Sequence, residues 1–112
     1  MKTLFEKIIS GELPTDKVYE DEKILVIKDK FPQAPIHFLL IPKKPIPNLN
    51  SMCEEDFSLV GEIFRIGQKL ANAFEVDQEG YRIVVNNGRN AGQEIAHVHF
   101  HLIGGKRLGP IG

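Results

Sequence analysis

The 112-residue sequence predicts an α+β domain, with a five-stranded antiparallel sheet covered by one short and one long helix. Five short apolar segments follow the alternation typical of strands, and two segments follow the three-to-four-residue repeat typical of helices. Most connections between the strands are too short for a parallel crossover, which favours antiparallel pairing. No repeat or linker interrupts the chain, so residues 1–112 are expected to form a single domain.

The first element is a short helix within residues 3–14. Thr3 is followed three residues later by Glu6, the capping-box pattern that starts a helix, and Gly11 and Pro14 end it. Four apolar residues share one side of this helix: Leu4, Phe5, Ile8 and Ile9.

Three strands are predicted next, at residues 17–21, 23–29 and 36–42, with a turn at Asp21–Glu22. Pro32 and Pro35 force an extended loop before the third of these strands. Alternation places two sets of its residues on opposite faces of the sheet: His37, Leu39 and Ile41 on one, Phe38 and Leu40 on the other.

The long helix is predicted at residues 52–74, opened by a second capping box formed by Ser51 and Glu54. A stripe with helical spacing is expected to face the sheet: Phe57, Val60, Phe64, Gly67, Ala71 and Phe74. Residues 80–88 and 95–105 are predicted to complete the sheet as its last two strands.

The last strand contains "HVHFHLIGG", which holds three of the four histidines of the sequence. Alternation points His97, His99 and His101 to one face. The Cα atoms of His97 and His101 would then lie roughly 13 Å apart, whereas zinc ligands lie about 2.1 Å from the metal. One strand can therefore supply two metal ligands, and a zinc site would also need His37 or a carboxylate from elsewhere.

Three histidines on one face are also hard to explain by packing, because up to six ring nitrogens would need partners. Imidazoles with an ordinary pKa of about 6.5 suit nucleophilic attack and proton transfer near neutral pH. The preceding "NNGRNAGQE" is either a plain connection or a glycine-containing loop that presents backbone N–H groups to a phosphate.

Composition narrows the partners and the location of the chain. A formal net charge of -1 argues against a basic nucleic-acid-binding surface. The sequence lacks a long apolar run and a recognisable signal peptide, so no membrane partner is expected. Cys53 is the single cysteine, which favours a reducing compartment and a cytoplasmic location.

Together with the histidine motif, "FEKIISGELP", "DKFPQAPIHFLLIPKK" and "GYRIVVNNG" resemble the Hint branch of the histidine triad (HIT) family, in the expected order. The resemblance covers nearly the whole chain. It implies a homodimer with a continuous ten-stranded sheet that needs no metal or other cofactor. It also implies hydrolysis of purine nucleoside phosphoramidates, AMP or GMP derivatives in which a P–N bond joins an amine to the nucleotide.

The same resemblance assigns roles to particular residues. His99 would be the nucleophile that forms a nucleotidyl-histidine intermediate, flanked by His97 and His101 as phosphate and proton contacts, with His37 in support. Asp29 would bind the ribose. The remaining nucleotide-binding residues would be Lys30, Asn86, Gly92, Gln93, Glu94, Leu4, Phe5, Ile8, Ile27 and Leu39.

Two residues depart from the pattern of better-known relatives, because Glu94 stands in place of a serine and Lys30 in place of an apolar residue. The effect of these two residues on substrate selectivity stays open. Three other functions also stay open: dinucleoside polyphosphate hydrolysis or nucleotidyl transfer, a nucleotide-binding scaffold without catalysis, and a zinc-binding module.

Overall fold

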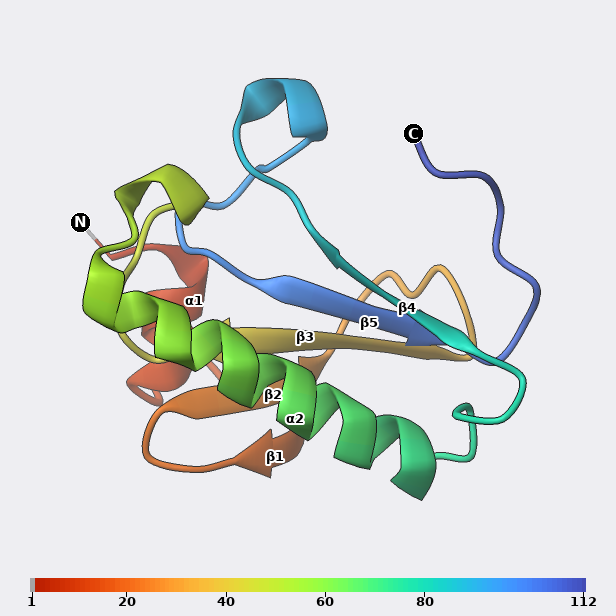
Figure 1. The fold of residues 1–112 in the computed structure, drawn as a ribbon. Helices are drawn as coiled ribbons and strands as arrows, with labels where there is room; N and C mark the ends of the chain where they lie inside the picture. Colours follow the sequence, from red (N-terminus) through yellow and green to blue (C-terminus); the bar gives the residue numbers. More distant parts are fainter. Residues whose placement is uncertain (1) are drawn as a thin grey trace.

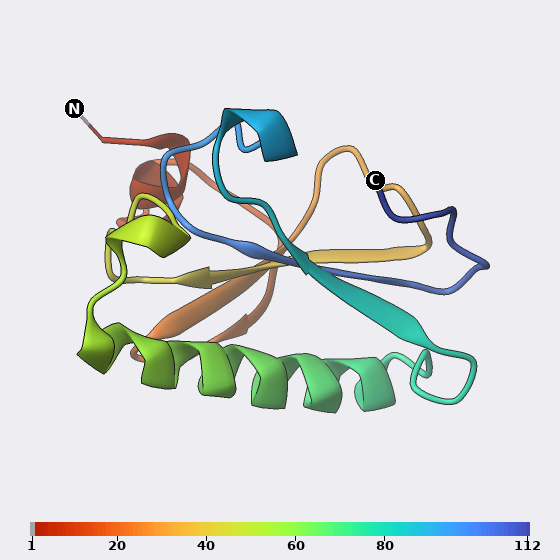
Figure 2. The same ribbon diagram turned by 45° about the horizontal axis from the view of Figure 1, so that its top comes forward.

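A computed structural model describes residues 2–112 and confirms the predicted α+β class. The strands form one antiparallel sheet in the order β1-β2-β3-β5-β4, with the two α-helices on opposite faces (Figures 1 and 2). The strands are β1 (Lys17–Glu20), β2 (Ile24–Lys28), β3 (Ile36–Pro42), β4 (Tyr81–Val85) and β5 (Phe100–Gly104). The α-helices are α1 (Leu4–Ile9) and α2 (Phe57–Ala73).

Helix α1 begins at the predicted capping box. The Glu6 N–H donates to Thr3 Oγ1 at 3.2 Å, and the Thr3 N–H donates to Glu6 Oε1 at 3.1 Å. Phe5 and Ile8 are buried against one face of the sheet, beside four residues of β2 and β3: Leu25, Ile27, Leu39 and Ile41. This short helix therefore covers only part of its face of the sheet.

Helix α2 begins later than predicted. The Ser51 N–H is capped by Asn48 Oδ1 at 3.0 Å in a separate 3₁₀ turn, Leu49–Ser51. A second such turn, Glu54–Asp56, follows and is closed by the Cys53 N–H donating to Asp56 Oδ2 at 2.8 Å. The predicted capping box of Ser51 and Glu54 is therefore wrong, because Asn48 and Asp56 take its place.

The predicted sheet-facing stripe of α2 is only partly correct. Gly67 and Ala71 are buried, but Phe57 and Phe64 are about half exposed, at 52% and 48%. The buried arc is rotated toward Ile63, Ile66 and Leu70. Gly67 permits this close approach, since a Cβ atom there would lie 3.1 Å from Ile83 Cδ1 of β4.

The last strand is shorter than predicted, because β5 begins at Phe100 and residues 95–99 are irregular. His101 pairs with Leu39 of β3, while Phe100 and Leu102 enter the core beneath α2 as alternation predicts. His97 and His99 thus precede the strand. Among residues 2–112, no helix has both the length and the apolar character needed to cross a membrane.

Candidate functional site

A pocket of about 470 Å³ opens on the face of the sheet that α1 partly covers. Its volume falls within the range of small-molecule sites. All but three of the predicted site residues line it: Leu4, Phe5, Ile8, Ile27, Asp29, Lys30, Leu39, Asn86, Gly92, Glu94, His99 and His101. A larger cleft lies at the opposite end of β4 and β5, and no histidine lines it.

One wall of the pocket is apolar and comes from three elements. Helix α1 contributes Leu4, Phe5 and Ile8, and the adjoining strands contribute Ile27 and Leu39. Six further residues line the pocket and were not predicted from the sequence: Leu13, Pro14, Thr15, Lys28, Phe31 and Ile95. They adjoin predicted elements or site residues in the chain, but no pattern of their own marks them.

The His99 ring carries its lone pair on Nε2. His99 Nδ1 lies 2.8 Å from the His97 carbonyl oxygen, which can only accept, so the ring proton is on Nδ1. The Phe5 ring meets His99 edge-on at 4.8 Å between centroids. Burial lowers the pKa of His99, with a smaller opposing effect from the bond to His97. The ring is therefore a neutral imidazole with nucleophilic Nε2 at neutral pH.

His97 lies beneath the pocket. Its side chain has no exposed surface, and Nε2 donates to the Pro42 carbonyl at 2.7 Å. The His97 ring is enclosed and does not line the pocket, so the phosphate contact expected of it has no support in this geometry. His97 instead orients His99 through its backbone carbonyl.

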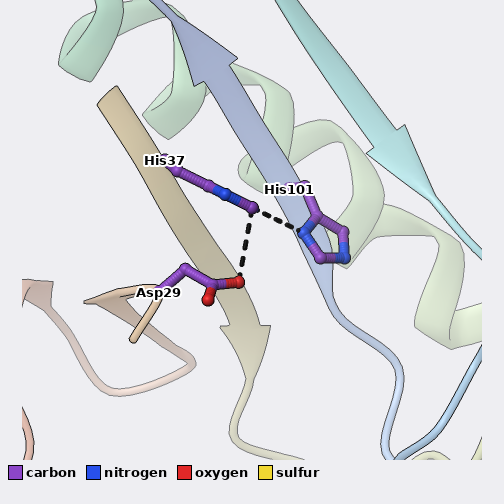
Figure 3. Close-up of side chains that lie close together, drawn as sticks. All are labelled: Asp29, His37 and His101. Atoms are coloured by element: carbon purple, nitrogen blue, oxygen red, sulfur yellow. Dashed lines mark hydrogen bonds and ion pairs between the residues drawn. The ribbon is translucent and has the colours of Figure 1, made fainter. Parts of the chain in front are cut away.

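His37 connects His101 to Asp29 (Figure 3). His37 Nε2 lies 3.0 Å from His101 Nδ1 and 3.4 Å from Asp29 Oδ2. His37 is 6% exposed and lies behind the pocket, in the supporting place expected of it. Burial lowers the pKa of His37, partly offset by Asp29, and lowers the pKa of His101 to about 4. Both rings are neutral at neutral pH.

Asp29 closes a turn and also faces the pocket. Asp29 Oδ1 accepts the Phe31 N–H at 2.8 Å, which is the turn role considered from the sequence. Oδ2 faces His37 at 3.4 Å. Because Asp29 lines the pocket, its carboxylate can accept hydrogen bonds from the hydroxyls of a ligand.

The glycine-containing loop is held together internally. The amides of Ala91, Gly92 and Gln93 all donate to carbonyls of Gly88 or Arg89. The Gln93 side chain accepts the Gly88 N–H and donates to the Pro47 and Ile95 carbonyls. The Gln93 side chain therefore braces the loop, and its expected contact with nucleotide stays a prediction. Asn86, Gly92 and Glu94 do reach the pocket.

Three donor groups could hold a metal ion: Asp29, His37 and His101, whose ligand atoms lie within 4.8 Å of one another. A zinc site was expected to need two histidines of the last strand together with His37 or a carboxylate, but only His101 of that strand belongs to this group. Whether His37 can ligate through Nε2 depends on where its ring proton sits.

Known proteins resemble this chain along most of its length. The HIT domain family matches residues 10–108. The chain is 53% identical to an uncharacterized HIT-like protein of Chlamydia muridarum, over 99% of this chain and 87% of that protein. It is 40% identical to a purine nucleoside phosphoramidase of Escherichia coli, over 98% and 92% of the two chains.

Solved structures show the same fold. A HIT family hydrolase from Legionella pneumophila is 42% identical, with a TM-score of 0.93 and 96% of each chain covered. A histidine triad protein from Clostridium difficile is 36% identical, with the same TM-score and all of both chains covered.

Proposed function

The chain belongs to the HIT domain family, and from that premise we propose that it hydrolyses purine nucleoside phosphoramidates. The relative of Escherichia coli that bears this activity in its name aligns with nearly the whole chain. The pocket supports the proposal, because it combines an apolar wall, a carboxylate and two histidines in one cavity.

The nucleotide is oriented by these three features. The purine base lies against the α1 wall of Leu4, Phe5 and Ile8, with Lys30 at its edge. Asp29 accepts hydrogen bonds from the ribose hydroxyls. The phosphorus then lies near His99, with Asn86, Gly92 and Glu94 around the phosphate end.

The reaction proceeds in two displacements. His99 Nε2 attacks phosphorus, a P–N bond to His99 forms, and the P–N bond to the amine breaks. The amine leaves as a neutral molecule only if its nitrogen gains a proton. His101, beside His99 at 5.2 Å between ring centroids, passes that proton to the amine and regains one from solvent. Water then cleaves the nucleotidyl-histidine, gives nucleoside monophosphate and returns a proton to the site.

One observation carries this proposal: the 2.8 Å bond from His99 Nδ1 to the His97 carbonyl leaves the Nε2 lone pair free in the pocket. We expect His99→Gly to lower the kcat of AMP release from adenosine 5′-phosphoramidate by several orders of magnitude, while AMP still binds. Lys69→Ala, on the exposed surface of α2, is the matched control. Undiminished turnover by His99→Gly would remove His99 from the nucleophile role. Rates of the wild-type protein on diadenosine polyphosphate, measured in parallel, test the alternative activity of dinucleoside polyphosphate hydrolysis.

We also propose that two copies pair through β4. This strand is an edge of the sheet, so its outer side can pair with another copy. Phe57 and Phe64, the half-exposed aromatics of α2, supply apolar surface for such a contact.

A cytoplasmic location stays a prediction.

A further inference from the structure

We propose that the main-chain N–H of Gln33 fixes the tautomer of His37, and through it the tautomer of His101. In consequence His101 presents an Nε2–H donor to the pocket, and the cluster of Asp29, His37 and His101 is a hydrogen-bonded chain that orients this donor rather than a metal site. Gln33 is thus a positioning residue. The use of this donor in catalysis rests on the proposed phosphoramidase function, whereas the tautomers themselves do not.

The main-chain N–H of Gln33 is a hydrogen-bond donor that cannot accept. The Gln33 N–H donates to His37 Nδ1 at 3.0 Å. An amide N–H cannot accept, so His37 Nδ1 must keep its lone pair. The single proton of the neutral His37 ring is therefore on Nε2. A doubly protonated ring would lose the Gln33 bond, which agrees with the burial that keeps His37 neutral.

The proton on His37 determines the next ring. His37 Nε2 and His101 Nδ1 are 3.0 Å apart, and two lone pairs at that distance would repel. His37 Nε2–H therefore donates to His101 Nδ1, and Asp29 Oδ2 at 3.4 Å is the more distant acceptor. The proton of a neutral His101 must then lie on Nε2. The His101 ring lines the pocket, so this chain of hydrogen bonds ends in a donor beside His99.

The tautomer of His37 also affects metal binding. Ligands of a tetrahedral zinc at about 2.1 Å lie about 3.4 Å apart, close to the 3.0 Å and 3.4 Å that separate His37 Nε2 from its two neighbours. Proximity alone would therefore suggest a zinc site. However, a metal ligand needs a lone pair on Nε2, and the Gln33 amide already holds the lone pair of Nδ1. Zinc would have to displace the Gln33 bond or form an imidazolate.

The loop that carries Gln33 is fixed at several points, so its amide is a fixed donor. The Asp29 N–H donates to the His37 carbonyl at 3.0 Å, which closes the loop at its base. Pro35 packs on Gly105, where φ is +97° and a Cβ atom would lie 3.0 Å from Pro35 Cβ. The loop therefore cannot easily move away from His37.

Nitrogen-15 NMR of the imidazole rings of the wild-type protein at pH 7.5 tests the proposal directly, because protonated and unprotonated ring nitrogens resonate far apart. We expect His37 and His101 as Nε2–H tautomers and His99 as the opposite Nδ1–H tautomer. His99→Gly and His101→Gln assign the signals by loss. A His101 ring protonated on Nδ1 would overturn the proposal, whether or not the enzyme is active.

Gln33→Pro removes the N–H, and Gln33→Ala keeps it as the matched control. We expect Gln33→Pro to lower kcat by about tenfold or more, since general acid catalysis contributes about 10² to 10⁴, with little change in KM. Its His101 signals should shift toward the other tautomer, and zinc chloride should inhibit it at concentrations at least about tenfold lower than the wild type.

Gln33→Ala should match the wild type in all three measurements. Wild-type tautomers and zinc sensitivity in a folded Gln33→Pro protein would overturn the proposal. If Gln33→Pro does not fold, the wild-type spectrum alone decides. Expected tautomers in a protein without phosphoramidase activity would instead contradict the proposed function and leave this inference intact.

Discussion

The three histidines of "HVHFHLIGG" have three different hydrogen-bond partners and therefore three different surroundings. His97 donates to the Pro42 carbonyl, His99 to the His97 carbonyl, and His101 faces the ring of His37. The alternation of a strand predicts the same orientation for all three rings. The sequence could not separate them, because two of the three partners lie about 60 residues earlier in the chain.

The pKa of the nucleophile leads to a prediction for the pH dependence of the reaction. Attack requires the neutral form of His99, which is lost as the pH falls through its pKa. Burial lowers that pKa, so the loss should occur below the ordinary value of about 6.5. We expect kcat/KM for adenosine 5′-phosphoramidate, measured from pH 4.5 to 8, to fall on the acid side with a midpoint below 6.5.

The rates measured at low pH must be corrected for uncatalysed hydrolysis of the substrate in acid, which a protein-free control measures. The apparent midpoint belongs to the coupled rings rather than to His99 alone, since His37 and His101 also have lowered pKa values. An acid-side midpoint at or above 6.5 would contradict a neutral, buried nucleophile.

Most of the site was predictable because the family resemblance applies residue by residue. Twelve predicted residues line the pocket, including Asp29, Asn86 and the apolar wall. His97 and Gln93 do not line the pocket, and their side chains turn toward backbone carbonyls instead. Such local hydrogen bonds depend on where loops end in space, which residue types alone do not specify.

At the scale of elements, α1 connects a capping motif to the nucleotide pocket. We expect Thr3→Ala to lower the free energy of unfolding by about 1 kcal/mol, the usual cost of losing a cap. It should also raise KM with little effect on kcat, because α1 carries Leu4, Phe5 and Ile8 of the pocket wall. Urea unfolding and steady-state kinetics measure the two effects.

Thr3→Ser keeps the capping hydroxyl and is the matched control. If Thr3→Ala lowered the stability but left KM unchanged, α1 would not be a wall of the nucleotide site.

Strand β3 was predicted best. The bounds of β3 are those expected, because apolar residues on both faces define it and prolines end it. The start of α2 was missed, since Asn48 and Asp56 cap two short turns ahead of it. Residues 95–99 were predicted as strand but are irregular, because they bond to neighbouring loops, as when the Val98 N–H donates to the Ile46 carbonyl at 2.7 Å.

At the scale of the whole molecule, the two faces of the sheet carry different tasks. Helices α2 and α1 lie on the two opposite faces (Figure 2). The face beneath α2 holds the larger apolar core, and the face with α1 holds the pocket. The core can therefore be fully packed while the other face stays open to a ligand.

The proposed dimer belongs to this scale. We expect the wild-type protein to sediment as a dimer at micromolar concentrations, and Phe64→Glu to shift it toward monomer by placing a charge in an apolar contact. Ser58→Glu adds the same charge on another side of α2 and should remain dimeric. A wild-type monomer at tens of micromolar would contradict pairing through β4 and the neighbouring side of α2.

The most direct test of the central claim is mass spectrometry of the protein quenched during turnover of adenosine 5′-phosphoramidate. We expect a fraction of the wild-type chains to carry one adenylyl group, located on the peptide that contains His99 and absent from His99→Gly. A full time course of turnover without any adduct, or with the adduct on another residue, would contradict covalent catalysis by His99.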